Sequence, residues 1–188
     1  MQGDAIQVVT AAIRDLLAAA LGVTPNDVYV GPLNDPQAAG KRASLFLHRV
    51  AVNGELRNST HYVPSSTPGS AAIAHDSSLP LDLRYLLTAG DEDSGGELSA
   101  LGTLGLAMQA LNGEPNLVGV PVQGEVVRIT VEPMTSEDMS RIWSLFPAAN
   151  YRTSVCYLAS PVWIDPKVPP AGGPPVTHEP HLVGQGRI

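Results

Sequence analysis

Apolar positions along the chain switch between the spacing of a helix and the spacing of a strand. Over residues 6–21 they recur three and four apart, which predicts an amphipathic helix with Asp4 as N-cap and Gly22 as C-terminal stop. Over residues 81–88 apolar and polar side chains alternate, which predicts a strand with one apolar face. Because that face must be covered, we expect the helix to lie on the sheet that contains this strand.

A second predicted strand, residues 44–52, runs into the pair Asn53-Gly54. Both residues tolerate positive φ, and the pair is typical of two-residue hairpin turns. The sequence therefore predicts a β-hairpin whose second arm is residues 55–60. We expect this hairpin and the strand at residues 81–88 to form the core sheet.

Five further elements follow from the same patterns: a strand at residues 28–30, a helix from about Glu97, a strand at 126–131, a helix at 136–146 and a strand at 152–165. Thr135 and Asp138 resemble a capping box for the helix at 136–146. Gly102 and Gly105 lower the propensity of the helix that begins near Glu97, so we expect close packing to recover the cost. The last strand is interrupted at Ser160-Pro161, which predicts a bulge or a sheet edge there.

Two stretches lack any periodicity. Residues 62–78 are rich in Ser, Pro, Ala, Gly and Thr, which predicts a long mobile loop flanked by solvated His61 and His75. Six prolines follow Asp165, which predicts an extended tail over residues 166–188. The predicted organisation is one α+β domain, residues 1–165, with a mixed or antiparallel sheet covered by two or three helices, followed by the Pro-rich tail.

The composition restricts the partners. Of the 188 residues, 44% are hydrophobic and 15% are charged, which is typical of a globular chain with a weakly charged surface. The net charge of −7 and the scattered distribution of eleven Lys and Arg residues disfavour nucleic acid. The first 22 residues contain no apolar stretch of spanning length, so we expect neither a signal peptide nor membrane insertion.

Residues with catalytic chemistry are sparse. Cys156 lies in an apolar strand and is expected to be a buried hydrophobe. His48 is expected to be half-buried in a strand, and His178-x-x-His181 offers too few ligands for a metal. No nucleophile elbow, phosphate loop or dinucleotide fingerprint occurs. The sequence predicts no catalytic, cofactor-binding or metal-binding residue, no cofactor and no enzyme activity.

Four motifs together resemble a known family. They are Ser-Leu-Phe-Leu-His-Arg-Val at 44–50, Leu-Asp-Leu-Arg-Tyr-Leu-Leu-Thr at 81–88, Leu-Gly-Leu-Ala-Met-Gln-Ala-Leu at 104–111, and Ile-Trp-Ser at 142–144. Their order and spacing, with Asn53 and Leu-Arg-Asn at 56–58, resemble the cap or tail-terminator proteins of contractile injection systems, the phage-tail-like particles of the extracellular injection class. The resemblance covers roughly residues 6–165, and His48 stands where an aromatic residue is expected.

The resemblance implies a structural role and a phage tail-terminator-like α+β fold. It implies a homohexameric ring that sits on the end of the inner tube and anchors the last layer of the sheath. The implied partners are other copies of the chain, the inner tube protein and the sheath protein. Assembly in the bacterial cytoplasm is also implied, as part of an injection particle whose release the sequence leaves open.

Three regions are candidates for these contacts. The loop at 62–78 and the acidic tip at 91–93 are candidates for the tube or the ring lumen, and the glycine-containing helix suits a ring interface. The last strand and the tail are candidates for a strand offered to the sheath. The candidate partner-binding residues are Asp91, Glu92, Asp93, Gly102, Gly105, Ser160, Pro161, Trp163, Pro169 and Pro170.

Two functions of other classes stay open at this point. One is a small metal-dependent hydrolase built on His61, His75 and the acidic loop. The other is a monomeric protein-binding module.

Overall fold

The computed structural model describes residues 3–63, 72–90 and 96–167. Predictions that concern residues 64–71, 91–95 or 168–188 lie outside the described residues. Within them, a six-stranded sheet in the order β1-β2-β5-β8-β7-β6 forms the centre of the molecule. The strands are β1 (Val28–Val30), β2 (Ala43–Val52), β5 (Leu79–Ala89), β6 (Asn116–Val118), β7 (Val126–Val131) and β8 (Ser154–Ile164).

The sheet is mixed, because β1 runs parallel to β2 while every other neighbouring pair is antiparallel. Three helices, α1 (Ala5–Leu21), α2 (Gly96–Gly113) and α3 (Ser136–Trp143), pack around it. The described part of the chain also contains three short 3-10 helices, η1 (Pro25–Asp27), η2 (Pro36–Ala38) and η3 (Val120–Val122). The α+β class and the helix-covered mixed sheet are confirmed.

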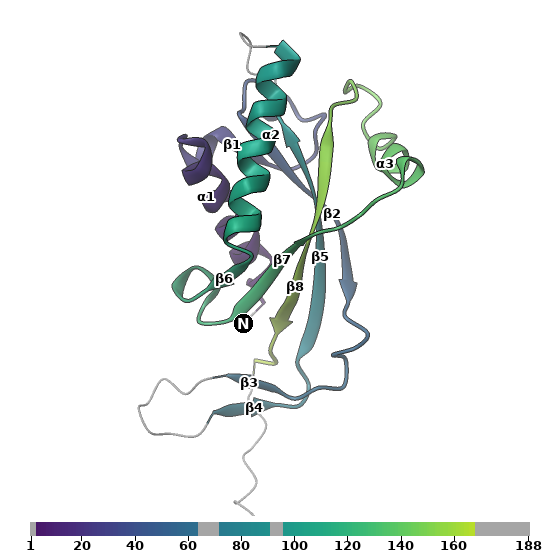
Figure 1. Cartoon of the computed structure of the whole chain (residues 1–188). Helices are drawn as coiled ribbons and strands as arrows, with labels where there is room; N and C mark the ends of the chain where they lie inside the picture. The colour runs from purple at the N-terminus through teal and green to yellow at the C-terminus, as the bar shows by residue number, and fades with distance from the viewer. Residues whose placement is uncertain (1–2, 64–71, 91–95, 168–188) are drawn as a thin grey trace, which may run out of the picture.

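Two apolar cores hold the helices to the sheet. The larger one joins α1 and α2 to one face of the strands, where the alternation of β5 places Leu83, Tyr85 and Leu87. The smaller one lies under α3, where Leu86 of β5 and Cys156 of β8 meet Ile142, Trp143 and Phe146. Figure 1 shows α1 and α2 beside each other, with α3 on the other side of the long strands.

One buried hydrogen bond adds to the apolar contact between α1 and β5. The hydroxyls of Tyr85 and Thr10 lie 2.8 Å apart, and Thr10 Oγ1 also donates to the carbonyl of Ile6 at 2.6 Å. The Tyr85 hydroxyl is therefore the donor to Thr10. This bond fixes the position of α1 along the sheet.

The helix ends follow the sequence in part. Gly22 ends α1 in the left-handed conformation, with its N–H directed to the carbonyls of Ala18 and Ala19, as predicted. Asp4, however, makes no side-chain cap bond, and its carboxylate instead accepts a hydrogen bond from Gln123. The cap of α3 is confirmed, because Thr135 accepts from the Asp138 N–H, but this helix ends at Trp143 and is shorter than expected.

The predicted hairpin at Asn53-Gly54 is wrong. Residues 55–60 form no strand, and β2 pairs with β5 along its whole length. The Asn53 amide explains the difference, since its Nδ2 donates to Asp82 of β5 and its Oδ1 accepts from the N–H groups of Glu55 and Leu56. These bonds form an Asx-type turn that directs the chain away from the sheet.

The prediction of a long loop over residues 62–78 is also wrong near both ends of that range. Residues 61–63 and 73–75 pair as β3 (His61–Val63) and β4 (Ile73–His75), a separate two-stranded sheet. Figure 1 shows this sheet at the far end of β5 and β8, below the helices in that view.

The last strand is internal and lies between β5 and β7. The predicted bulge is present, since the register against β5 shifts between Leu81 and Leu83, opposite Ser160-Pro161, whose peptide bond is cis. The alternative prediction of a sheet edge holds only beyond Ser160. Ser160 pairs with Arg128 of β7, whereas residues 162–164 pair with β5 alone among the described strands.

Candidate functional site

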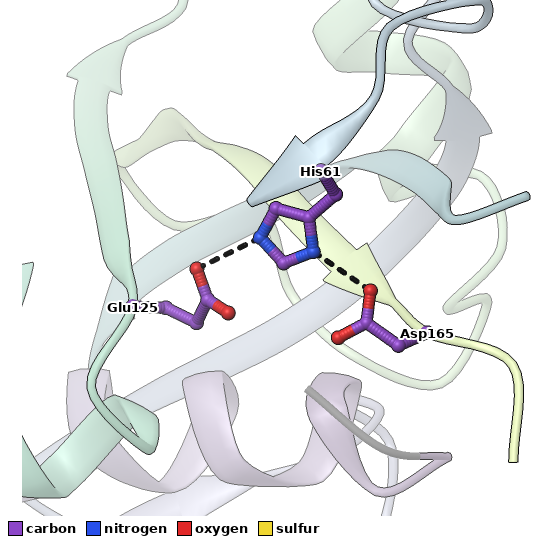
Figure 2. Close-up of side chains that lie close together, drawn as sticks. All are labelled: His61, Glu125 and Asp165. Atoms are coloured by element: carbon purple, nitrogen blue, oxygen red, sulfur yellow. Dashed lines mark hydrogen bonds and ion pairs between the residues drawn. The ribbon is translucent and has the colours of Figure 1, made fainter. Parts of the chain in front are cut away.

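Three chemically active side chains meet where the β3–β4 hairpin joins the main sheet. His61 comes from β3, Glu125 directly precedes β7, and Asp165 directly follows β8 (Figure 2). His61 Nδ1 lies 2.7 Å from Asp165 Oδ1, and His61 Nε2 lies 3.2 Å from Glu125 Oε2. Both nitrogens of one imidazole thus face a carboxylate. We call these three residues the His61 cluster.

The cluster is largely enclosed. The side chains of His61, Glu125 and Asp165 are 6%, 12% and 11% exposed. The His61 ring stacks on Trp163 of β8, with centroids 4.5 Å apart and planes 8° from parallel. Burying charged groups is costly unless they are paired, so the ring and both carboxylates hold one another in place.

Asp165 is the most strongly perturbed member of the cluster. Burial raises its pKa, but hydrogen bonds, those from Ser78 Oγ and His61 Nδ1 among them, outweigh burial and lower the pKa to about 2. Ser78 Oγ donates to Asp165 Oδ1 at 2.5 Å. The carboxylate is therefore ionised at neutral pH.

The arrangement of the His61 cluster favours a structural role, in which it connects the β3–β4 hairpin to the main sheet, over a role in hydrolysis. The Ser78 hydroxyl bonds the carboxylate and not the imidazole, so it lacks the contact with a base that activates a nucleophile. Cys156 is buried as predicted, and burial raises the pKa of its thiol to about 11, which keeps it protonated.

Two histidine predictions need correction. His61 and His75 were expected to be solvated at the ends of a loop, but they are only 5% and 7% exposed. The reason is that the two residues pair across β3 and β4, and the small sheet is folded against the ends of the long strands. His48 is half-buried in β2, as predicted.

Sequence reasoning missed the His61 cluster itself. Its members lie 64 and 104 residues apart along the chain, so no local spacing brings them together. Asp165 and Glu125 were visible only as single carboxylates at strand ends. Nothing in the sequence signals that these ends meet.

Close packing of Gly102 and Gly105 was expected, but the described residues make no such contact with either glycine. Gly102 and Gly105 are exposed on α2, and a Cβ added to either one meets nothing within 4 Å. With Leu98 and Leu101 they occupy positions i, i+3, i+4 and i+7, a single face of the helix. Leu98 is 82% exposed, and we call this face the outer stripe of α2. A helix that is apolar on both sides is typical of a buried position in an assembly.

Other predicted site residues have internal roles. Ser160 Oγ donates to Asp82 at 2.6 Å and accepts from Asn53 at 3.2 Å. Trp163 is buried against the His61 ring, so it anchors the hairpin from inside. Pro161 lies in the bulge of β8. The remaining candidates, Asp91, Glu92, Asp93, Pro169 and Pro170, lie outside the described residues.

The outer edge of β2 is open over most of its length. β1 pairs with β2 only from Ala43 to Leu45, and among the described strands none pairs with the outer side of β2 beyond that point. Val50 and Val52 on this edge are 44% and 47% exposed. An exposed apolar edge is a template for strand addition by another chain.

The described residues form an α+β protein that leaves apolar side chains exposed on one helix, α2, and on one edge strand, β2. Residues 8–178 match the Pvc16 N-terminal domain, and the chain belongs to that family. None of the described helices is long and apolar enough to cross a membrane.

Two solved structures share the fold. The first is the sheath/tube terminator of PVC, an extracellular contractile injection system, in its extended state, with a TM-score of 0.61 and 18% identity over 97% of this chain. The second is the tube-terminating cap of the anti-feeding prophage, with a TM-score of 0.62 and 20% identity over 91% of this chain. The chain spans 64% and 58% of the lengths of those two proteins. No protein of curated function matches it.

Proposed function

We propose that this chain is the terminator of a contractile injection system, a structural protein that caps the inner tube and holds the last layer of the sheath. The observation that carries the proposal is the shared fold, since two tube-terminating proteins match 97% and 91% of this chain. The family membership supports it. The enclosed His61 cluster agrees with a non-enzymatic role, because it leaves little open surface for a substrate.

The outer stripe of α2 is our candidate for the contact between neighbouring subunits in a six-membered ring. A cyclic ring needs two different surfaces on each subunit, and this stripe supplies one that is apolar and not covered by any of the described residues. Its glycines leave room for the close approach of a second backbone. Both features suit a contact that forms only in the assembly.

The open edge of β2 is our candidate for the sheath contact. Strand addition needs free N–H and C=O groups along an edge, and residues 46–52 offer them. We prefer this edge to the Ser160-Pro161 segment, because β8 is paired with β5 on one side and, up to Ser160, with β7 on the other. The Pro-rich residues 166–188 are a second candidate, on sequence grounds alone.

The experiment is a complementation test in a strain that produces the particle and lacks this protein. The unaltered gene should restore sheathed particles of uniform length. Val50→Lys with Val52→Lys, which places charge on an exposed edge, should leave capped tubes but weaken sheath attachment. Thr130→Lys, on the half-buried face of β7, is the matched control for an added charge on the sheet.

The result that would overturn the proposal is a deletion strain with full-length, sheathed particles indistinguishable from those of the parent. A deletion of residues 168–188 in the same assay separates the two sheath candidates. Loss of sheath attachment in that variant alone would assign the contact to the tail.

A further inference from the structure

We propose that a groove beside α3 binds the Pro-rich segment of a second copy of this chain. The groove has a volume of about 730 Å³, and five apolar side chains contribute to its lining: Met134, Met139, Trp143, Phe146 and Tyr151. We call it the α3 groove. The proposed occupant is residues 166–175, Pro-Lys-Val-Pro-Pro-Ala-Gly-Gly-Pro-Pro. The inference does not depend on the terminator role, because it concerns one contact between two copies of the chain.

The first argument is the chemistry of the groove. The Trp143 ring packs against two other rings, with centroids 5.2 Å from Tyr151 and 6.1 Å from Phe146. Trp143 and Phe146 belong to the core under α3, whereas Tyr151 is 66% exposed. Grooves lined by aromatic rings bind Pro-rich segments in several unrelated domains. Met134 and Met139 are half-buried, and their unbranched side chains can adapt to an occupant.

The second argument is the chemistry of the segment. Residues 166–175 contain five prolines and a single charged residue, Lys167. They begin with Pro-x-x-Pro, a spacing that places both prolines on one side of a polyproline II helix, which has three residues per turn. Such a segment is already extended before it binds, so little entropy is lost on binding. A Pro-rich segment with one charge therefore suits a groove of aromatic and methionine side chains.

The third argument decides which copy supplies the segment. Trp143 and Phe146 pack with Cys156, which lies near the start of β8. The strand from Cys156 to the end of β8 at Ile164 is about 25 Å long. Figure 1 shows the same separation, with α3 toward one end of β8 and the β3–β4 hairpin at the other.

This separation is too long for the start of the segment to return to its own groove. Pro169 lies five residues beyond Ile164, and five extended residues span at most about 18 Å. The Pro-x-x-Pro part of the segment therefore reaches an α3 groove only on another copy.

The contact would link neighbouring copies by an extended arm. Each copy offers one groove and one segment at separate places, so the contact is head-to-tail and can close into a ring. One such contact is small. Several contacts in a closed ring reinforce one another, because each holds the next segment near its groove.

The first test is a disulfide cross-link between two differently tagged full-length chains. One chain carries Ser140→Cys at the groove, and the other carries Ala171→Cys in the segment. The native Cys156 does not interfere, because it is buried and burial raises the pKa of its thiol to about 11. We expect mild oxidation of the mixture to give the mixed dimer. Ala20→Cys, an exposed position on α1, replaces Ser140→Cys in the control and should give none.

The second test is the binding of a fluorescent peptide of residues 166–175 to the full chain, followed by anisotropy. The receiving chain carries alanine at its own five prolines of this segment, so that it does not compete with the peptide. Tyr151→Ala should weaken binding about tenfold, because it removes an exposed aromatic anchor. Tyr62→Ala on β3, where the side chain is also 66% exposed, is the matched control and should change nothing. A peptide with alanine in place of each proline should not bind.

The inference is overturned if the peptide does not bind, or if Tyr151→Ala binds it as tightly as the parent. Cross-linking of Ala171→Cys to Ala20→Cys as readily as to Ser140→Cys would also overturn it. The double variant Ser140→Cys with Ala171→Cys separates the two sources of the segment. Cross-linked dimers support a second copy, whereas a cross-link confined to single chains means that the segment binds its own groove. Both tests omit tube and sheath, so their failure leaves the terminator role unaffected.

Discussion

The two exposed glycines of α2 give a prediction in which stability and assembly change in opposite directions. Gly102→Ala with Gly105→Ala adds two methyl groups to the outer stripe of α2. Neither methyl group meets another atom within 4 Å, and neither glycine has a positive φ. The isolated chain should therefore gain stability, because alanine loses less backbone entropy than glycine in a helix.

The expected gain follows from helix propensity. Each substitution in an exposed helix interior contributes about 0.5–1 kcal/mol, so the double variant should gain about 1–2 kcal/mol. For a domain of this size that corresponds to a rise in Tm of about 2–8 °C. In the proposed ring, the same methyl groups would occupy the space left for a neighbouring subunit, so assembly should weaken.

The assay is urea and thermal denaturation of the dilute chain, at concentrations where Tm does not depend on protein concentration. Gly22→Ala is the control, because that glycine has φ +67° at the end of α1. It should lose about 1–2 kcal/mol, the cost of a left-handed conformation for an L-residue. If the double variant is less stable than the parent, the glycines are packed within the chain and the reasoning about an open outer stripe is refuted.

Three further predictions test the fold. Gly90→Ala should destabilise the chain by more than about 3 kcal/mol in urea denaturation, because the new Cβ would lie 1.5 Å from the Lys41 carbonyl oxygen; a stable variant would contradict this packing. Tyr85→Phe should cost about 1 kcal/mol, since it removes the bond to Thr10 but leaves the Thr10 hydroxyl bonded to a carbonyl; an unchanged midpoint would count against that bond. Asp165 has a pKa of about 2 in the folded chain against a reference value of 3.8. Its contribution to the free energy of unfolding is therefore present above pH 4 and is lost as pH falls toward 2. Asp165→Asn should remove this part of the acid sensitivity, on the order of 2 kcal/mol, and an unchanged pH profile of unfolding would contradict it.

Local pattern was sufficient for the regular elements. The three-and-four spacing of α1 and the alternation of β5 each predict one buried face, and the structure buries both of these faces. It also buries Leu86 and Thr88 on the opposite face of β5, which the alternation does not predict. The capping residues Thr135 and Gly22 act within a few positions of themselves, so their roles were also visible. The three-residue strand β6 was missed, because so short a segment carries no periodic signal.

Pairing between strands was less predictable. Asn53-Gly54 has the composition of a hairpin turn, yet the Asn53 side chain bonds Asp82, a residue distant in sequence. That long-range bond decides the path of the chain, and local propensity does not contain it. The β3–β4 hairpin was missed for a similar reason, since its strands have three residues each and depend on contact with the end of the sheet.

The His61 cluster could not be predicted from local sequence either. His61, Glu125 and Asp165 are far apart in the chain, and each looked ordinary in its own segment. Only the topology, which brings the start of β7 and the end of β8 to the base of the hairpin, joins them. The sequence showed the two glycines of the outer stripe of α2. That this stripe faces away from the sheet could be seen only from the packing of the opposite face of α2 against the core.

The central claim is that this chain ends an inner tube. Electron microscopy of purified inner tubes, mixed with the full chain at increasing ratios, tests it most directly. The account predicts a ring of six copies at one end of each tube, with the other end and the tube wall bare. Tubes that remain without terminal density at saturating protein, or that are decorated along the wall, would contradict it.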